Sequence, residues 1–335
     1  MSGRERAIRF GAIGCGSIAQ RAMLPAITSD RRARLVAVAS RSGEKARAIA
    51  AKFKCKAVTG YEELIARSDI DAVYIGLPIG LHARWAIEAA RHKKHVLCEK
   101  TLATSESETR DVVSACRQEG VALLEGLAYQ FHPQHRVVRE FVDSGGIGEP
   151  LLFQGWFGFP PLESPHRYDP TLGGGALLDA GAYVIHAARR FFGSEPVVSS
   201  ASLENGDRDV EIYGSAHLLF EKPRAALVAF GFNHMYRNSY AVWGSEGLLT
   251  LTRAFSISPS FEPVMVVERQ GCREERTLPA ADPFKCEVAA FCDGLEDPGL
   301  GRHWAEDALS HASVLERVRL VNHQAIGATR NDSSS

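Results

Sequence analysis

Three polar side chains recur at a regular spacing within an otherwise apolar segment. Asp179, Tyr183 and His186 occupy positions i, i+4 and i+7, which share one face of an α-helix. A buried helix carries an acid, a phenol and an imidazole on one face only where a partner or a cavity receives them. Such groups could bind a polar ligand or exchange protons with it. The alternative is a solvent-facing stripe, with the Tyr183 ring packed.

A pair of charges ends a short apolar stretch in the first third of the chain. Residues 95–98 have the pattern of a strand, and Glu99 and Lys100 follow at its end. In doubly wound α/β sheets, ligands gather at the carboxyl ends of the strands. Lys100 is therefore placed to stabilise negative charge on a reacting oxygen. The alternative is that both residues only end the strand in solvent.

A glycine motif stands between the first strand pattern, at 8–13, and the first helix pattern, at 17–29. It reads Gly14-Cys15-Gly16-Ser17-Ile18-Ala19. In such a motif the first Gly permits a tight turn, the second lets the backbone approach a pyrophosphate, and Ala allows close packing of helix on strand. The N–H groups at the start of the helix favour phosphates. The pattern predicts a dinucleotide site; a tight turn without a ligand is the alternative.

The end of the second predicted strand discriminates between NAD and NADP. An NAD site usually places Asp or Glu at this position, whereas this chain has Ser40 followed by Arg41. A hydroxyl and a guanidinium suit a 2′-phosphate, and Lys45 adds a second positive charge. We therefore predict NADPH as the cofactor. If Arg41 is only a solvated loop charge, Glu44 becomes the residue that would favour NAD.

The elements that must position these groups follow two different rhythms. Up to residue 127, strand patterns alternate with helix patterns, which predicts a parallel sheet covered on both faces. We therefore expect an N-terminal Rossmann domain over residues 1–127. Residues 128–335 are expected to form a C-terminal α+β domain for substrate binding and oligomerisation. The overall class is α/β.

The second domain begins with a helix pattern at 133–142, and the glycines at 173–175 open a helix that continues to about 192. Between 197 and 268 strand patterns follow one another with short turns, which predicts a large, open and mostly antiparallel sheet. Helices are expected at 283–294 and 305–324. The helix that continues to about 192 can cover one face of this sheet, and the other face can be a subunit interface. We therefore expect a homo-oligomer, either a dimer or a tetramer, that is built through this sheet.

Composition limits the possible partners. The 335 residues carry 39 Lys and Arg against 40 Asp and Glu, a formal net charge of −1, so no nucleic-acid partner is expected. The 7 cysteines form no C-x-x-C pair, which favours a reducing cytoplasm and argues against a metal site. We find neither a signal peptide nor a stretch that approaches the length of a membrane span, and expect no membrane partner.

The motifs together resemble the glucose-fructose oxidoreductase / inositol dehydrogenase / MocA family over nearly the whole chain. Within that family the chain is most similar to the sugar 3-ketoreductases of deoxysugar biosynthesis, which act on dTDP-linked ketosugars. The residues that carry the family resemblance are the glycine motif, Leu77-Pro78 with His82, Glu99-Lys100, and 173–179 with Gly181. The narrower likeness rests on 131–135, on 159–161 with Arg167-Tyr168, on Asp179-x-Gly181-x-Tyr183, and on Tyr236-x-Asn238-x-Tyr240.

This resemblance implies NADPH-dependent reduction of a keto group, at carbon 3, of a dTDP-linked 6-deoxysugar in deoxysugar and antibiotic biosynthesis. Lys100 matches the lysine that contacts the reacting oxygen, Tyr183 the proton donor, and Asp179 an acid near the substrate. The expected cofactor contacts are Gly14, Cys15, Gly16, Ser17, Ile18, Ala19, Ser40, Arg41, Lys45, Leu77, Pro78, His82, Glu99 and Arg167. The expected substrate contacts are Lys100, Phe157, Asp179, Tyr183, His186, Tyr236 and Tyr240.

Two positions depart from the family pattern. The family usually has Glu-Lys-Pro where this chain has Thr101 in place of Pro, and a cis bond costs more before Thr, so we predict a trans Lys100–Thr101 bond. His186 replaces the Asp of many relatives and is either a second proton shuttle or a residue that shapes the substrate site. Two other functions stay open: an NAD(P)-dependent dehydrogenase of a free sugar or inositol, and a nucleotide-sensing regulator without chemistry.

Overall fold

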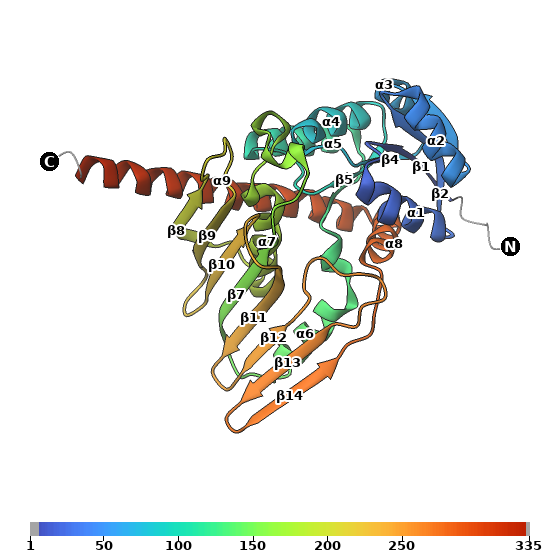
Figure 1. Cartoon of the computed structure of the whole chain (residues 1–335). Helices are drawn as coiled ribbons and strands as arrows, with labels where there is room; N and C mark the ends of the chain where they lie inside the picture. The colour runs from blue at the N-terminus through green and yellow to red at the C-terminus, as the bar shows by residue number, and fades with distance from the viewer. Residues whose placement is uncertain (1–6, 333–335) are drawn as a thin grey trace. The chain divides into compact units, whose positions relative to one another are not determined.

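The computed structural model describes residues 7–332, which divide into two compact units (Figure 1). The first unit comprises the chain through Ala128 together with Phe284–Leu309, and the second comprises Tyr129–Pro283 together with the chain from Ser310 onward. In this described part, no helix is both long enough and apolar enough to cross a membrane.

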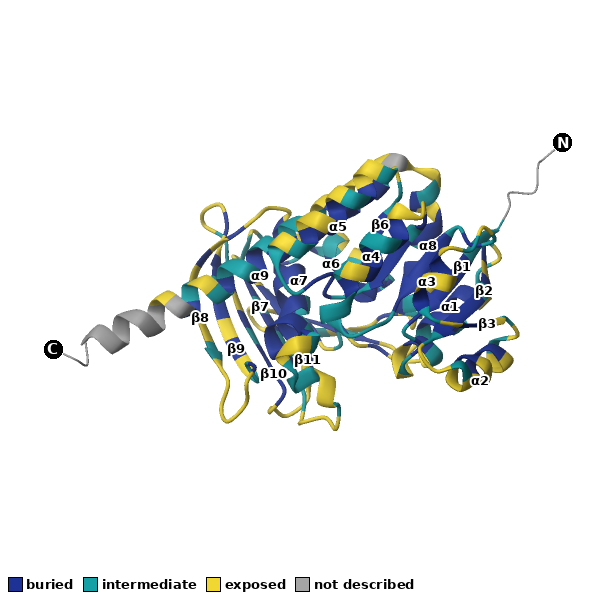
Figure 2. Ribbon diagram, turned by 90° about the horizontal axis from the view of Figure 1, so that it is seen from above, coloured by how far each residue is buried: buried dark blue, intermediate teal, exposed yellow. Residues whose placement is uncertain are grey.

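The first unit is built on a six-stranded sheet in the order β3-β2-β1-β4-β5-β6, in which all neighbouring strands are parallel. Its strands are β1 (Ile8–Ile13), β2 (Ala33–Ser40), β3 (Lys56–Thr59), β4 (Ala72–Ile75), β5 (His95–Glu99) and β6 (Leu123–Gly126). Strands β1, β4, β5 and β6 are dark blue along most of their length in Figure 2, because helices cover both faces, whereas the edge strand β3 is mostly exposed. The strand order reverses between β1 and β4, the point at which such sheets bind ligands. The predicted Rossmann fold is confirmed.

Two helices of this unit begin after a serine whose side chain satisfies a free backbone N–H group. Ser42 accepts a hydrogen bond from the Lys45 N–H at the start of α2 (Gly43–Phe53), and Ser105 accepts one from the Glu108 N–H at the start of α5 (Glu106–Glu119). The other helices are α1 (Leu24–Ser29), α3 (Tyr61–Ile65) and α4 (His82–Arg91). A π-turn at Ala19–Met23 precedes α1. Because Pro25 has no N–H to donate, the wider turn before it lets the helical run continue.

The second unit contains an eight-stranded sheet in the order β14-β13-β12-β11-β7-β10-β9-β8. Its strands are β7 (Pro150–Gly158), β8 (Val197–Glu204), β9 (Tyr213–Leu219), β10 (Ala225–Gly231), β11 (Arg237–Gly244), β12 (Leu248–Leu251), β13 (Val264–Arg269) and β14 (Cys272–Thr277). Strands β7 and β10 run parallel, and the other neighbouring pairs are antiparallel, so the mostly antiparallel sheet predicted from the sequence is confirmed.

One face of this sheet is covered by α7 (Ala182–Phe192), which packs against β7 and β10 (Figure 1). A π-turn at Leu177–Gly181 leads into α7, and α6 (Pro133–Asp143) precedes the sheet in the chain. The last helix, α9 (Pro298–Asp332), contributes its later part to this unit: the His311 ring contacts the Ala182 carbonyl at 3.0 Å.

The helical segment Phe284–Leu309 belongs to the first unit, whereas the predicted boundaries place it in the second domain, residues 128–335. It contains most of α8 (Pro283–Glu296) and the start of α9, and it packs on the first unit. Phe291 lies 5.7 Å from Phe10 of β1 between ring centroids and stacks on Trp304 at 6.3 Å. These apolar contacts bring the segment back to the first sheet after the chain has completed the second.

Candidate active site

The glycine turn after β1 contains two glycines with different surroundings. Gly14 has φ of +74°, and a Cβ there would lie 2.5 Å from the backbone of Gly76. A Cβ on Gly16 would meet no protein atom within 4 Å. Gly14 is therefore required by the fold, whereas Gly16 leaves open space next to the backbone. This space fits the close approach of a pyrophosphate, so the turn suits a bound dinucleotide.

These two glycines predict separable effects. We expect Gly14→Ala to lower the free energy of unfolding by more than about 2 kcal/mol, because it adds a left-handed residue and a clash. We expect Gly16→Ala to change that free energy by less than about 0.5 kcal/mol and to weaken NADPH binding roughly tenfold or more. Chemical denaturation and fluorescence titration measure the two quantities. Equal responses of the two variants would contradict this division.

The other residues of the glycine motif differ in their exposure to solvent. Cys15 and Ala19 are buried, while Ser17 and Ile18 are exposed at the start of the helical run. The Cys15 carbonyl accepts a hydrogen bond from the Gln20 side chain at 3.0 Å. Burial raises the pKa of the Cys15 thiol to about 12. This thiol is therefore a packing group.

The end of β2 carries a hydroxyl and two cations. The Ser40 hydroxyl accepts a hydrogen bond from the Ser42 N–H at 3.2 Å, and Arg41 and Lys45 are both exposed. The charge of Lys45 slightly opposes the effect of burial on the pKa of Cys15. Glu44, the residue that would favour NAD, is also exposed, in the first turn of α2. The set of hydroxyl and cations fits a phosphate group at this strand end.

Lys100 follows β5 directly, in a segment held by its neighbours. The Tyr74 hydroxyl donates a hydrogen bond to Glu99 at 2.9 Å, and burial raises the pKa of Glu99. The predicted trans bond is wrong: Lys100–Thr101 is cis in the structure. The residues that follow are fixed by tertiary contacts that the local sequence does not reveal, among them a hydrogen bond from the Leu102 N–H to Glu125 at 2.9 Å.

His82, an expected cofactor contact, has no exposed surface in the structure. Its Nδ1 lies 2.8 Å from the Thr101 carbonyl oxygen, and its Nε2 lies 2.7 Å from the Leu77 carbonyl oxygen. Leu77 and Pro78 are half-buried, and the Leu77 side chain borders the glycine turn. The structure thus places His82 behind the residues that border the dinucleotide turn.

In the second unit, Tyr183 is half-buried in the first turn of α7 and its ring is fixed by other aromatic rings. Phe157 meets it edge-on, with ring centroids 5.1 Å apart and planes at 86°. Tyr129 and Phe255 lie 5.8 Å and 5.9 Å away. Such packing restricts the direction in which the phenol can point. The sequence singled out Phe157 and Tyr183 but not Tyr129 or Phe255, which come from distant segments.

Asp179 forms an ion pair with Arg167, and both side chains are largely shielded from solvent. The Arg167 guanidinium also lies over the Phe159 ring, 5.5 Å from its centroid. Burial lowers the pKa of Arg167, and the phenol of Tyr183 acts in the opposite direction, so the two groups interact electrostatically. Arg167 was expected to contact the cofactor; the structure pairs it with Asp179, beside Tyr183.

The glycine-rich turn before α7 explains how Arg167 is held. The Gly175 N–H donates a hydrogen bond to the Arg167 carbonyl at 2.9 Å, and a Cβ on Gly174 would lie 2.6 Å from that oxygen. Gly175 has φ of +124°, and a Cβ there would meet the Glu211 carboxylate at 2.5 Å. Glu211, which sequence reasoning missed, also accepts a hydrogen bond from the Leu177 N–H at 3.2 Å.

Asp179, Tyr183 and His186, which the sequence predicts on one helix face, differ in their burial. Asp179 lies in the π-turn at Leu177–Gly181, and Tyr183 and His186 lie in the regular helix that follows it. Asp179 and Tyr183 are half-buried, whereas His186 has no exposed surface and its Nδ1 lies 2.6 Å from the Tyr129 hydroxyl. His186 therefore contacts Tyr129, one of the rings that pack on Tyr183.

The two remaining predicted substrate contacts have different environments. Tyr240 is buried, and its hydroxyl lies 3.1 Å from His135 Nδ1. Burial raises the pKa of Tyr240 and lowers the pKa of His135 to about 3. Tyr236 is 41% exposed, accepts a hydrogen bond from the Asn238 side chain at 3.1 Å and lies under the Arg253 guanidinium. Of this pair, Tyr236 presents the larger surface to a ligand. Within residues 7–332, no group of three or more His, Cys, Asp or Glu is arranged to hold a metal.

Two family models match most of this chain. The oxidoreductase family with an NAD-binding Rossmann fold, GFO/IDH/MocA, matches residues 8–127, and the GFO/IDH/MocA C-terminal domain matches residues 135–250. This chain belongs to the GFO/IDH/MocA oxidoreductase family.

Relatives of this GFO/IDH/MocA protein are similar over nearly its whole length. A dTDP-3,4-didehydro-2,6-dideoxy-alpha-D-glucose 3-reductase from Saccharopolyspora spinosa is 40% identical, over 94% of this chain and 97% of the relative. An NADP-dependent D-xylose 1-dehydrogenase from Haloferax volcanii is 32% identical, over 92% and 95%. The crystal structure of a 3-ketoreductase from Actinomadura kijaniata in complex with NADP and TDP-benzene matches with a TM-score of 0.91, at 39% identity, over 94% and 98%. The resemblance inferred from the sequence is confirmed.

Proposed function

We propose that this GFO/IDH/MocA protein reduces a keto group, at carbon 3, of a dTDP-linked 6-deoxysugar with NADPH, within deoxysugar biosynthesis. The observation that carries the proposal is its 40% identity, over 94% of the chain, to a dTDP-sugar 3-reductase. The dinucleotide turn with open space at Gly16 and the phenol fixed in α7 support the same chemistry.

The residues present would hold the cofactor at two places. The backbone from Gly14 to Ala19 would receive the pyrophosphate, and Ser40, Arg41 and Lys45 would receive the 2′-phosphate. When bound, NADPH supplies the hydride that reduces the carbonyl carbon.

The chain itself supplies charge and a proton. We assign to the Lys100 ammonium the stabilisation of negative charge that develops on the sugar oxygen. We assign to Tyr183 the delivery of its hydroxyl proton to that oxygen, because an ordinary phenol keeps its proton at neutral pH. Arg167 interacts electrostatically with Tyr183 and favours the phenolate left behind, while Asp179 fixes the guanidinium.

The experiment mixes the purified protein with NADPH and a dTDP-3-keto-6-deoxysugar and follows the absorbance of the reduced cofactor. We expect oxidation of NADPH that depends on the sugar. A second arm supplies NADP with free D-xylose or inositol, because the 32% identity to a D-xylose dehydrogenase favours that alternative. Turnover in the second arm alone would overturn the proposal, and NADPH binding without turnover in either arm would favour a nucleotide sensor.

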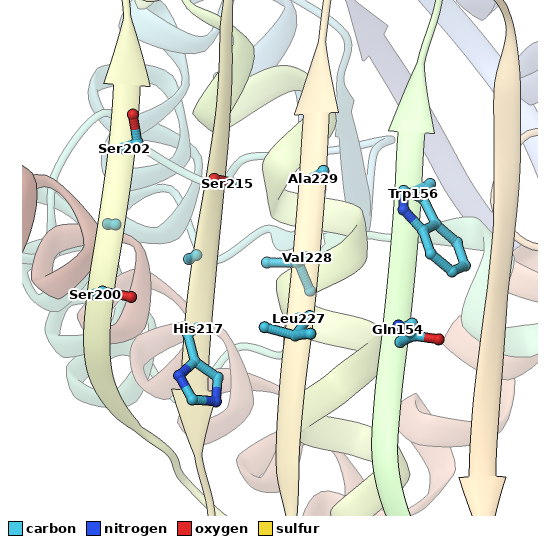
Figure 3. Close-up of a pocket in the computed structure, with 11 residues that line it drawn as sticks. Gln154, Trp156, Ser200, Ser202, Ser215, His217, Leu227, Val228 and Ala229 are labelled. Atoms are coloured by element: carbon cyan, nitrogen blue, oxygen red, sulfur yellow. The ribbon is translucent and has the colours of Figure 1, made fainter.

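We also propose that the protein is a homo-oligomer joined through the open face of its second sheet. The strand registers align one apolar residue from each of six neighbouring strands across that face, and among them the side chains of Val197 and Trp243 are 65% and 59% exposed. The row consists of Val197, Leu219, Ala225, Leu152, Trp243 and Leu248. Next to it, Ser200, His217, Leu227 and Trp156 line a hollow of about 450 Å³ (Figure 3). An exposed apolar row of this kind is typical of a subunit interface.

This interface predicts a change of mass. We expect Trp243→Glu combined with Leu219→Arg to convert a dimer or tetramer to monomers, because charges replace two exposed apolar side chains of the row. Light scattering after size exclusion measures the mass. Leu320→Glu is the control, since Leu320 is 51% exposed but lies on α9. A monomeric wild type, or an unchanged mass in the double variant, would exclude this face as the interface.

A cytoplasmic location completes the proposal. All of the cysteines from Cys15 to Cys292 are free, which suits a compartment that keeps thiols reduced.

A further inference from the structure

His82 joins two segments that the proposed reaction uses. It is the first residue of α4, and its side chain is fully buried. On one side the ring is 2.7 Å from the carbonyl of Leu77, whose side chain packs so close to the glycine turn that a Cβ on Gly14 would lie 2.7 Å from it. On the other side the ring is 2.8 Å from the carbonyl of Thr101, which follows Lys100 in the chain. One imidazole thus connects the dinucleotide turn with the lysine segment.

The chemistry of the two contacts restricts the state of the ring. Both partners are backbone carbonyl oxygens, which accept hydrogen bonds and cannot donate them. A neutral imidazole carries a single N–H and donates to one carbonyl only, while its other nitrogen turns a lone pair toward the second oxygen. The imidazolium carries two N–H groups and donates to both. The number of protons on His82 therefore decides whether one or both segments are held.

The charges around the ring act in opposite directions. Lys100, at the end of β5, disfavours a positive ring, and Glu125, on β6, favours it. Burial has the largest effect and lowers the pKa of His82, while the Thr101 and Leu77 carbonyls act against burial. The share of protonated rings consequently grows as the pH falls through a value below that of an ordinary imidazole, about 6.5.

We infer that His82 is a positioning residue that couples the dinucleotide turn to the Lys100 segment through its two ring nitrogens, and that the protonated ring makes both bonds. The part that concerns catalysis rests on the proposed role of Lys100. The part that concerns the ring and the dinucleotide turn does not depend on which sugar is reduced.

Ring-nitrogen spectra of the isotopically labelled enzyme with NADP test the protonation directly. The His82 signals are identified by their loss in His82→Asn. We expect two protonated nitrogens at acidic pH and one bare nitrogen above the transition. A bare nitrogen at every pH at which the protein stays folded would overturn the two-bond coupling. This measurement uses the wild-type chain and needs no sugar.

Two substitutions separate the two bonds. In His82→Asn the amide nitrogen replaces Nδ1 and retains the contact with Thr101, so we expect a roughly tenfold weaker affinity for NADPH and a kcat within about twofold of wild type. In His82→Gln the amide nitrogen replaces Nε2 and retains the contact with Leu77, so we expect the affinity to be kept and kcat to fall roughly tenfold. A residue with only a structural role would not divide the two constants in this way.

His95→Asn is the matched control. The His95 ring accepts one hydrogen bond, from the Ala122 N–H at 3.0 Å, at the opposite end of β5 from Lys100, and an Asn oxygen can accept the same bond. We expect neither constant to change in this variant. If the two His82 variants alter affinity and kcat by the same factors, or alter neither, the coupling is wrong. If the wild type reduces no dTDP-ketosugar, the proposed function fails, while the spectra and the NADPH affinities still decide on the coupling.

Discussion

Replacing Tyr183 by Phe is expected to lower kcat for ketosugar reduction by about 10²- to 10⁴-fold, the usual contribution of a positioned general acid. The ring is fixed by Phe157, Tyr129 and Phe255 at centroid distances between 5.1 and 5.9 Å, and Phe can occupy the same space. The substitution therefore removes one hydroxyl and leaves the surrounding packing in place. We expect the affinity for NADPH, measured without sugar, to stay within about twofold of wild type, because the dinucleotide turn belongs to the other unit.

Stopped-flow measurement of NADPH oxidation at saturating sugar gives the rate. Tyr213→Phe is the control, because it removes a phenol from a 40% exposed side chain of the same unit. A Tyr183→Phe variant that retains half of the wild-type kcat, with the control behaving alike, would show that another group delivers the proton. Tyr129 would then be the next phenol to test, since its ring lies against Tyr183.

The Rossmann unit could be predicted from the sequence because its signals are local. A strand buried on both faces is a short apolar run, and a glycine turn between such a run and a helix identifies the dinucleotide site without knowledge of distant residues. Even the exposed strand β3 (Lys56–Thr59) is expected from the two apolar residues Ala57 and Val58. The unit then follows from the rule that successive crossovers are right-handed.

The features that could not be predicted depend on contacts between distant segments or on the absence of burial. Strand β14 (Cys272–Thr277) is mostly charged and exposed, because an edge strand needs no apolar alternation. The helical segment Phe284–Leu309 returns to the first unit through Phe291, whose partner Phe10 is far away in sequence. Within the candidate site, the packing of the Tyr183 ring involves Tyr129 and Phe255, which are far away in sequence.

Local sequence is also insufficient where a side chain acts through backbone groups. His82 could be recognised as part of a family motif, but its partners are the carbonyls of Leu77 and Thr101, and carbonyls have no signature in a sequence. The glycines at 174 and 175 are a similar case. They signal a tight turn in the sequence, and the structure shows that this turn packs on Arg167 and on the half-buried carboxylate of Glu211.

Replacing Lys100 by Met is expected to lower kcat about 10²- to 10³-fold, the loss that follows when one stabiliser of a developing oxyanion is removed. Met keeps much of the length and apolar volume of the lysine stem, so the loss reports the charge rather than the packing. We expect kcat of Lys100→Arg to be at least about tenfold higher than that of Lys100→Met, because Arg restores a positive charge with a different shape. Lys93→Met is the control, since Lys93 is exposed and pairs with Glu119 on the surface of the same unit.

The double variant Tyr183→Phe, Lys100→Met decides whether the two residues act on the same oxygen. Residues that act as a unit on one transition state give losses that are far from multiplicative, whereas independent residues give a product of the single losses. We expect the double variant to lose little more than the worse single variant. A loss equal to the product would place the amine and the phenol in separate steps. Unchanged turnover would exclude both residues from the reaction. The fold and the dinucleotide turn would then stand without an assigned catalytic residue.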